Sequence, residues 1–69
     1  MRTVTGGELA RLVERRGWTL LRVNGSHHIY GKPGERARLS IPIHGSASLK
    51  AGLLKSLFRS ASLSEADLD

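Results

Sequence analysis

The 69-residue chain has no cysteine and few aromatic residues, with one tryptophan, one tyrosine and one phenylalanine. The absence of cysteine excludes a disulfide framework and a thiolate metal site, and nothing in the sequence indicates an oxidising compartment. No apolar run approaches the roughly 20 residues that a membrane span requires, and the N-terminal stretch lacks the apolar centre of a signal peptide. We therefore expect a soluble, cytoplasmic protein with no membrane contact.

Acidic residues are also few, since six Asp and Glu stand against eleven Lys and Arg, giving a formal net charge of +5. The acidic side chains are scattered along the chain, so we predict no metal site and no bound cofactor. A chain of this length forms one small domain, which we place at residues 1–69. A strong positive charge on so small a surface attracts polyanions, and nucleic acid is the first candidate. An acidic protein partner would use the same charge, and solubility alone is a simpler explanation of it.

Capping signals predict a helix near the N-terminus. Thr5 and Glu8 have the spacing of a capping box, and Gly17 supplies the left-handed residue that commonly ends a helix. Apolar residues between these signals recur at helical spacing and form one stripe. Gly6 and Gly7 weaken only the first turn.

The middle of the chain carries the patterns of three strands. An Asn-Gly pair, the strongest short hairpin signal, joins two expected strands at about 18–24 and 26–32. After the turn "KPGE", the segment "RARLSIPI" alternates apolar and polar residues, which is typical of a half-buried strand. "LKAGLLKSLFRSA" then carries a broad apolar stripe and predicts a second helix. We therefore predict an α+β fold in the order α-β-β-β-α, a three-stranded antiparallel sheet with two helices on one face.

Side-chain alternation determines which of the two adjacent histidines faces the helices. The Asn-Gly hairpin and the "KPGE" turn both place His28 and Tyr30 on the more apolar side of the sheet, with Leu39, Ile41 and Ile43. We assign that side to the helices, so His28 is expected to be partly buried. His27 is then expected on the open face, although a one-residue bulge in either hairpin would exchange the two histidines.

The open face has the side chains for RNA cleavage. A histidine moves protons readily near neutral pH, and RNA carries its own nucleophile, the 2′-hydroxyl. His27 as general base, with Arg22 and Arg38 nearby to stabilise charge on the phosphate, would cleave the strand without metal. RNA contacts are predicted for four residues of this face and its turns: Arg22, Ser26, Arg36 and Arg38.

Two other classes of function would use the same face. A nucleic-acid-binding module without catalysis needs the basic residues alone, and "SHH" would then be polar strand residues with no chemical role. A module that binds a protein would use apolar surface, and the turn geometry places Trp18, Leu20 and Ile29 on the open face with His27.

The segments "GW", "GSHHIY", "SIPIH" and "LKAGLLKSLFRSASLS", in this order, resemble the HicA-type toxins of bacterial and archaeal toxin–antitoxin pairs over nearly the whole chain. The central signature is Gly-Ser-His followed by an aromatic residue, here Gly25, Ser26, His27 and Tyr30. The resemblance implies a fold like that of a double-stranded-RNA-binding domain. It also implies an endoribonuclease that arrests growth by cleaving mRNA and is neutralised by a HicB-type antitoxin.

The resemblance further implies that a strand-borne histidine is catalytic, and it assigns this role to His27, with His28 as the alternative because the histidine is doubled. Family members often carry a histidine near the end of the third strand, matched here by His44, for which proton transfer and capping of the strand both remain open. In a toxin, the apolar residues of the open face become the antitoxin-binding surface: Trp18, Leu20 and Ile29.

Overall fold

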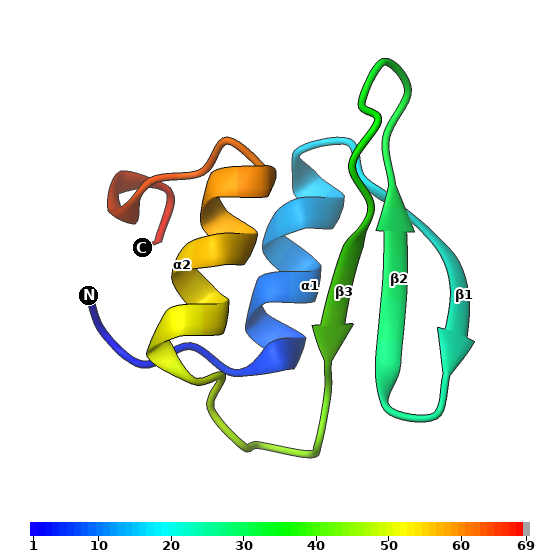
Figure 1. Cartoon of the computed structure of the whole chain (residues 1–69). Helices are drawn as coiled ribbons and strands as arrows, with labels where there is room; N and C mark the ends of the chain where they lie inside the picture. The colour runs from blue at the N-terminus through cyan, green and yellow to red at the C-terminus, as the bar shows by residue number, and fades with distance from the viewer. Residues whose placement is uncertain (69) are drawn as a thin grey trace.

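The structure, a computed structural model, describes residues 1–68. Its elements are α1 (Gly6–Arg15), β1 (Thr19–Asn24), β2 (His27–Gly31), β3 (Leu39–Pro42), α2 (Ala51–Ser60) and a short 3-10 turn, η1 (Glu65–Asp67) (Figure 1). The three strands form one antiparallel sheet in the order β1-β2-β3. The predicted α+β class and the order α-β-β-β-α are confirmed.

The two helices lie on the β3 side of the sheet, and β1 is the edge farthest from them (Figure 1). Tyr30, Leu39 and Ile41 point to the side of the sheet that the helices cover, and they form one buried core with apolar residues of both helices. The opposite side of the sheet, called the open face below, carries His27 and Ile29 of β2. Within residues 1–68, neither helix has the length and hydrophobicity that crossing a membrane requires.

The N-terminus of α1 is fixed by the predicted capping box and packs closely on β3. Thr5 Oγ1 accepts a hydrogen bond from the Glu8 amide at 3.1 Å, and a Glu8 carboxylate oxygen accepts one from the Thr5 amide at 2.9 Å. Gly6 lies so close to β3 that a Cβ atom built on it would be 2.1 Å from the carbonyl oxygen of Pro42. The glycine therefore does more than weaken a helical turn, because only a residue without a side chain fits between α1 and β3.

The strands pair in the predicted register near the histidines, but β1 contains a β-bulge. Asn24 pairs with His27, and Arg22 pairs with Ile29, after which the register shifts by one so that Leu20 pairs with Tyr30. The extra residue is Leu21. Because a bulge inserts one residue into one strand, every residue of β1 before Leu21 faces the side opposite to the one that simple alternation predicts.

The bulge contradicts two predicted positions. Trp18 was predicted on the open face, but it lies in the core with 4% of its surface exposed. Leu20 was predicted beside His27, but it pairs with Tyr30 and therefore faces the helix side, where it is 42% exposed because β1 is the edge strand. Ile29 does face the open side as predicted, although it is 9% exposed and offers little surface. Both errors have one cause, the residue inserted between Trp18 and the Asn-Gly hairpin.

The third strand is shorter than predicted. The "KPGE" turn forms as expected, with the Glu35 amide donating to the Lys32 carbonyl at 3.0 Å and Gly34 at φ +84°. β3 starts only at Leu39, so Arg36 lies in the connection between β2 and β3 and not on the sheet. A further ladder bond follows Pro42, because the Ile43 amide donates to the Ser26 carbonyl at 2.9 Å.

Candidate active site

His27 is exposed at the start of β2, on the open face as predicted. Its Nδ1 atom is 3.2 Å from Ser40 Oγ, which β3 places on the same face two residue pairs away. When Nδ1 carries the proton and donates to Ser40, the Nε2 atom has a free lone pair and can accept a proton. The contact with Ser40 therefore holds the imidazole in one orientation, and the tautomer protonated at Nδ1 suits a general base.

His28 has the structural environment that the alternation predicted. It is half-buried, it pairs with Val23 and Ile41, and it faces the helix side together with Tyr30. Its Nδ1 donates to the Ser26 carbonyl oxygen at 3.3 Å, within its own turn. The structure thus presents one histidine of the pair to solvent and leaves the other partly within the fold.

His44 lies beside the histidine pair although it is far away in the sequence. Its Nε2 atom is hydrogen-bonded to Ser26 Oγ at 3.1 Å, directly next to the ladder bond between Ile43 and Ser26. Two hydrogen-bonded pairs, Ser26 with His44 and His27 with Ser40, therefore lie near the start of β2. The alternation in "RARLSIPI" agrees with the position of Ser40 on the open face, but no sequence signal indicated the two side-chain bonds.

The arginines of the predicted site are spread along the open face. Arg22 pairs with Ile29 and so lies two residue pairs from His27, on the same face of the sheet. Arg38 lies farther away, because its Nε atom would be 3.2 Å from a Cβ atom on Gly31, at the other end of β2. Four residues of strand separate Gly31 from His27, about 13 Å. The prediction that both arginines lie close to His27 is right for Arg22 and wrong for Arg38, since the start of β3 places Arg38 opposite Gly31.

Tyr30, the aromatic residue of the sequence signature, supports the fold. It is 2% exposed, and its hydroxyl donates to a Glu14 carboxylate oxygen at 2.6 Å. Burial raises the pKa of Tyr30 to about 12, with the Glu14 hydrogen bond and negative charge adding to the effect. The phenol therefore stays protonated at neutral pH and links β2 to α1.

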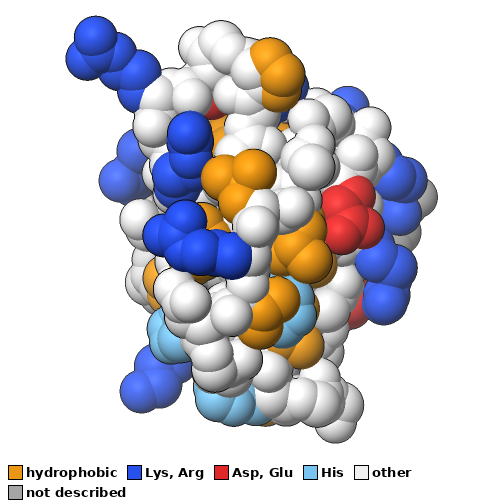
Figure 2. Space-filling model, turned by 90° about the vertical axis from the view of Figure 1, so that its right-hand side faces the viewer, with side chains coloured by type: hydrophobic (Ala, Val, Ile, Leu, Met, Phe, Trp, Pro, Cys, Tyr) orange, Lys and Arg blue, Asp and Glu red, His pale blue; other side chains and the backbone are white. Residues whose placement is uncertain are grey.

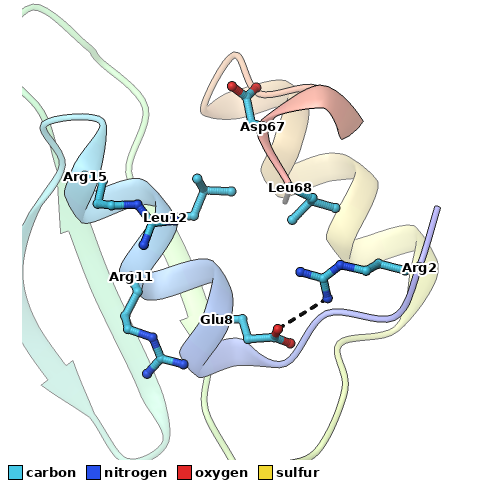
Figure 3. Close-up of a pocket in the computed structure, with 7 residues that line it drawn as sticks. All are labelled: Arg2, Glu8, Arg11, Leu12, Arg15, Asp67 and Leu68. Carbon is cyan, nitrogen blue, oxygen red and sulfur yellow. Dashed lines mark hydrogen bonds and ion pairs between the residues drawn. The ribbon is translucent and has the colours of Figure 1, made fainter.

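A second group of arginines lies around α1, in a cavity of about 180 Å³ between this helix and the C-terminal segment (Figure 3). Acidic partners balance part of this charge: Arg2 contacts Glu8 at 3.3 Å, and Arg16 contacts Asp67 at 2.6 Å. Among residues 1–68, no group of three or more histidine or acidic side chains is arranged to hold a metal ion. Within residues 1–68, the open face brings an exposed histidine together with Arg22, for which no ion pair is formed in this part of the chain.

These observations define a class of protein: a small, basic α+β domain that holds a histidine on the exposed face of its sheet. The family model described as the HicA toxin of bacterial toxin–antitoxin matches residues 6–63. The chain belongs to this family of toxins, and membership implies an antitoxin as partner. A search of curated proteins finds no match.

Proposed function

We propose that the protein is an endoribonuclease that cleaves mRNA in the cytoplasm, with His27 as the catalytic base. The observation that carries this proposal is the position of His27. It is exposed on the open face, hydrogen-bonded through Nδ1 to Ser40, and two residue pairs from Arg22, in a chain that belongs to a toxin family. A toxin of this kind would slow growth under stress by removing messages.

The proposed reaction uses the 2′-hydroxyl of the substrate as nucleophile. His27 Nε2 accepts the hydroxyl proton, the 2′-oxygen forms a bond to phosphorus, and the bond from phosphorus to the 5′-oxygen breaks. The leaving oxygen takes a proton from water. The products are a 2′,3′-cyclic phosphate and a 5′-hydroxyl, and no metal is required. Arg22 stabilises the charge on the phosphate, and Ser40 is a positioning residue that orients the ring.

The remaining predicted contacts form a path for the RNA strand. Ser26, hydrogen-bonded to His44, lies in the turn directly before His27, and Arg38 lies at the Gly31 end of the open face. Arg36 is exposed in the connection that leads into β3. A strand that follows β2 would pass all of these side chains, and its backbone would be bound chiefly through charge.

The antitoxin surface is proposed on β1, because Trp18 is buried and cannot anchor a partner. Leu20, Leu21 and Val23 are each more than 40% exposed along this edge strand. Figure 2, which views the molecule from the β1 side, shows hydrophobic side chains along the middle of the surface with Lys and Arg side chains on both sides. A HicB-type antitoxin with apolar side chains and acidic flanks would fit this surface.

The test compares His27→Ala with His28→Ala on an mRNA substrate. We expect His27→Ala to lose at least about 100-fold in cleavage rate while its melting temperature is unchanged, because general-base catalysis contributes about 10²–10⁴-fold. His28→Ala should lower the melting temperature, because His28 is partly buried. EDTA should have no effect, and a substrate with a 2′-deoxy residue at the cleaved position should stay intact.

Two results would count against the proposal. Equal cleavage by His27→Ala and the wild-type protein would remove His27 from the mechanism. Tight RNA binding by a wild-type protein that leaves the RNA intact would favour the alternative, a non-catalytic RNA-binding module that uses the same face.

A further inference from the structure

A pocket of about 430 Å³ opens on the same face as His27, at the other end of β2. Gly31 forms its floor, and because Gly31 is four residues from His27 on one strand, both face the same side. A Cβ atom on Gly31 would lie 2.8 Å from Leu21 Cδ1 and 3.2 Å from Arg38 Nε. The missing side chain thus lets the bulged Leu21 and the stem of Arg38 approach each other over the strand. Glycine within a strand often marks a place of such close approach.

The lining of the pocket combines two cations with apolar surface. Arg38 contributes a positive charge at the wall, and Leu21 and Pro33 contribute apolar side chains. Lys32 adds a second cation at the rim: its flexible side chain rests beside Gly17, with Nζ 4.0 Å from a Cβ atom placed there, and has to turn toward the pocket to meet a ligand. Glu35 is the acidic residue in the lining, and its backbone carbonyl accepts a hydrogen bond from Arg38 at 3.3 Å, which directs the guanidinium along the pocket wall. A ligand with an anionic group beside a flat apolar group suits this lining, and a nucleotide has both. A purely apolar protein side chain would leave the two cations without partners.

The position of the pocket relates it to His27. The two lie about 13 Å apart along β2, which is too far for a single nucleotide to occupy both. Between them no large side chain of β2 projects from the open face, because Ile29 is almost buried. Arg22 lies beside Ile29 on the neighbouring strand β1. An RNA strand bound at His27 and running along β2 would therefore bring a neighbouring nucleotide to Gly31.

We propose that the Gly31 pocket is a second RNA subsite, which binds a nucleotide on one side of the cleaved phosphate, with its phosphate near Lys32 and Arg38 and its base against Leu21 and Pro33. This inference rests on the proposed ribonuclease function. The subsite lies on one side of His27 only, so it distinguishes the 5′ from the 3′ direction of the substrate and contributes to the choice of cleavage position.

The experiment uses the full-length protein and three substrates: a dinucleotide with one cleavable phosphodiester, the same dinucleotide extended on its 5′ side, and the same dinucleotide extended on its 3′ side. We expect one extension, and not the other, to raise kcat/KM. Lys32→Gln and Gly31→Ala should each reduce that gain about tenfold, the effect of losing one phosphate or base contact. The three atoms nearest to the alanine at position 31 belong to the end of the Leu21 side chain and the stem of the Arg38 side chain, both exposed and flexible, so the fold should tolerate it. Arg59→Gln, which removes one exposed charge from α2, is the matched control and should keep the full gain.

Binding of 2′-deoxy versions of the extended substrate gives a second measurement. The slope of log Kd against log salt should fall by about 0.7–1 in Lys32→Gln, because one phosphate contact is lost. The proposal is overturned if neither extension changes kcat/KM, or if both variants keep the full gain. It is also overturned if the variants cleave like the wild-type protein but bind purified antitoxin more weakly, because the pocket is then a protein contact. If the wild-type protein cleaves no substrate at all, the proposed function fails and the subsite fails with it.

Discussion

Gly6 and Gly7 are neighbours in the first turn of α1, and the structure predicts opposite effects of replacing them with alanine. A Cβ atom on Gly6 would lie 2.1 Å from the Pro42 carbonyl oxygen and 3.0 Å from Ile43 Cγ1, whereas a Cβ atom on Gly7 would have no atom within 4 Å. A backbone oxygen on a sheet strand cannot turn aside as a side-chain end can. Gly6→Ala must therefore push α1 away from β3 by about 1 Å.

The size of the difference follows from known costs. Overpacking of a core by one methyl group typically costs about 1–3 kcal/mol, while replacing a helical glycine with alanine contributes up to about 1 kcal/mol of stability. Because both variants gain this helical contribution, they should differ by the cost of overpacking, about 1–3 kcal/mol in the free energy of unfolding. For a domain of this size, each kcal/mol changes the melting temperature by about 4–8 °C, so the difference should exceed about 4 °C.

Thermal unfolding followed by circular dichroism measures this directly. We expect Gly6→Ala to melt below the wild-type protein and Gly7→Ala to melt at or above it. Pro42 pairs with His27, so cleavage by Gly6→Ala should also fall at temperatures where the protein remains folded. If Gly6→Ala were as stable as Gly7→Ala, α1 could not approach β3 as closely as described, and the position of β3 under the active site would need revision.

Two further predictions concern Tyr30 and the edge strand. The pKa of Tyr30 is raised to about 12 in the folded protein, so the unfolded chain loses this proton first, and the stability from Tyr30 is complete below about pH 10 and is lost as pH rises toward 12. Chemical denaturation of the wild-type protein should show the free energy of unfolding falling by about 2–3 kcal/mol over this pH range, and Tyr30→Phe should not show this fall. At neutral pH, Tyr30→Phe should be less stable than the wild-type protein by about 1 kcal/mol, because it loses the Glu14 hydrogen bond. Equal pH profiles of the two proteins would refute the assignment. Leu20→Glu on β1 should weaken binding of the purified antitoxin at least tenfold by calorimetry, whereas Leu53→Glu, on α2 and 39% exposed against 42% for Leu20, should bind normally. Equal losses in the two variants would indicate a general effect of negative charge and not a contact on β1.

The fold and the side of His27 could be predicted because their signals are local. The capping box of Thr5 and Glu8, the Asn-Gly hairpin and the "KPGE" turn each act within a few residues, and each forms as expected. The two turns agree on the register at the histidines. His27 is consequently exposed, and His28 is half-buried.

The bulge could not be predicted, because the sequence around it fits either register. In "WTLLRVN" the two leucines are adjacent, so no polar residue marks the position of the extra residue. The burial of Trp18 determines the position of the bulge, and this burial is gained only when β1 packs against the rest of the core. The bonds of Ser40 and His44, and the fit of Gly6 against Pro42, likewise depend on distances between elements that are remote in the chain.

The bulge at Leu21 allows the sheet to bury Trp18 and expose His27 at the same time, which a regular hairpin would not allow. Without the inserted residue, Trp18 and His27 would fall on the same side of the sheet, so a strand that buried the tryptophan would also bury the histidine. The number of residues between Trp18 and His27 therefore determines which side of the sheet each of them faces, whatever the side chains between them are. Removing or adding one residue there should impair the protein more than replacing either leucine, while a change of two residues should preserve both orientations. In related toxins, whether the number of residues in this segment is odd or even should therefore matter more than which residues it contains.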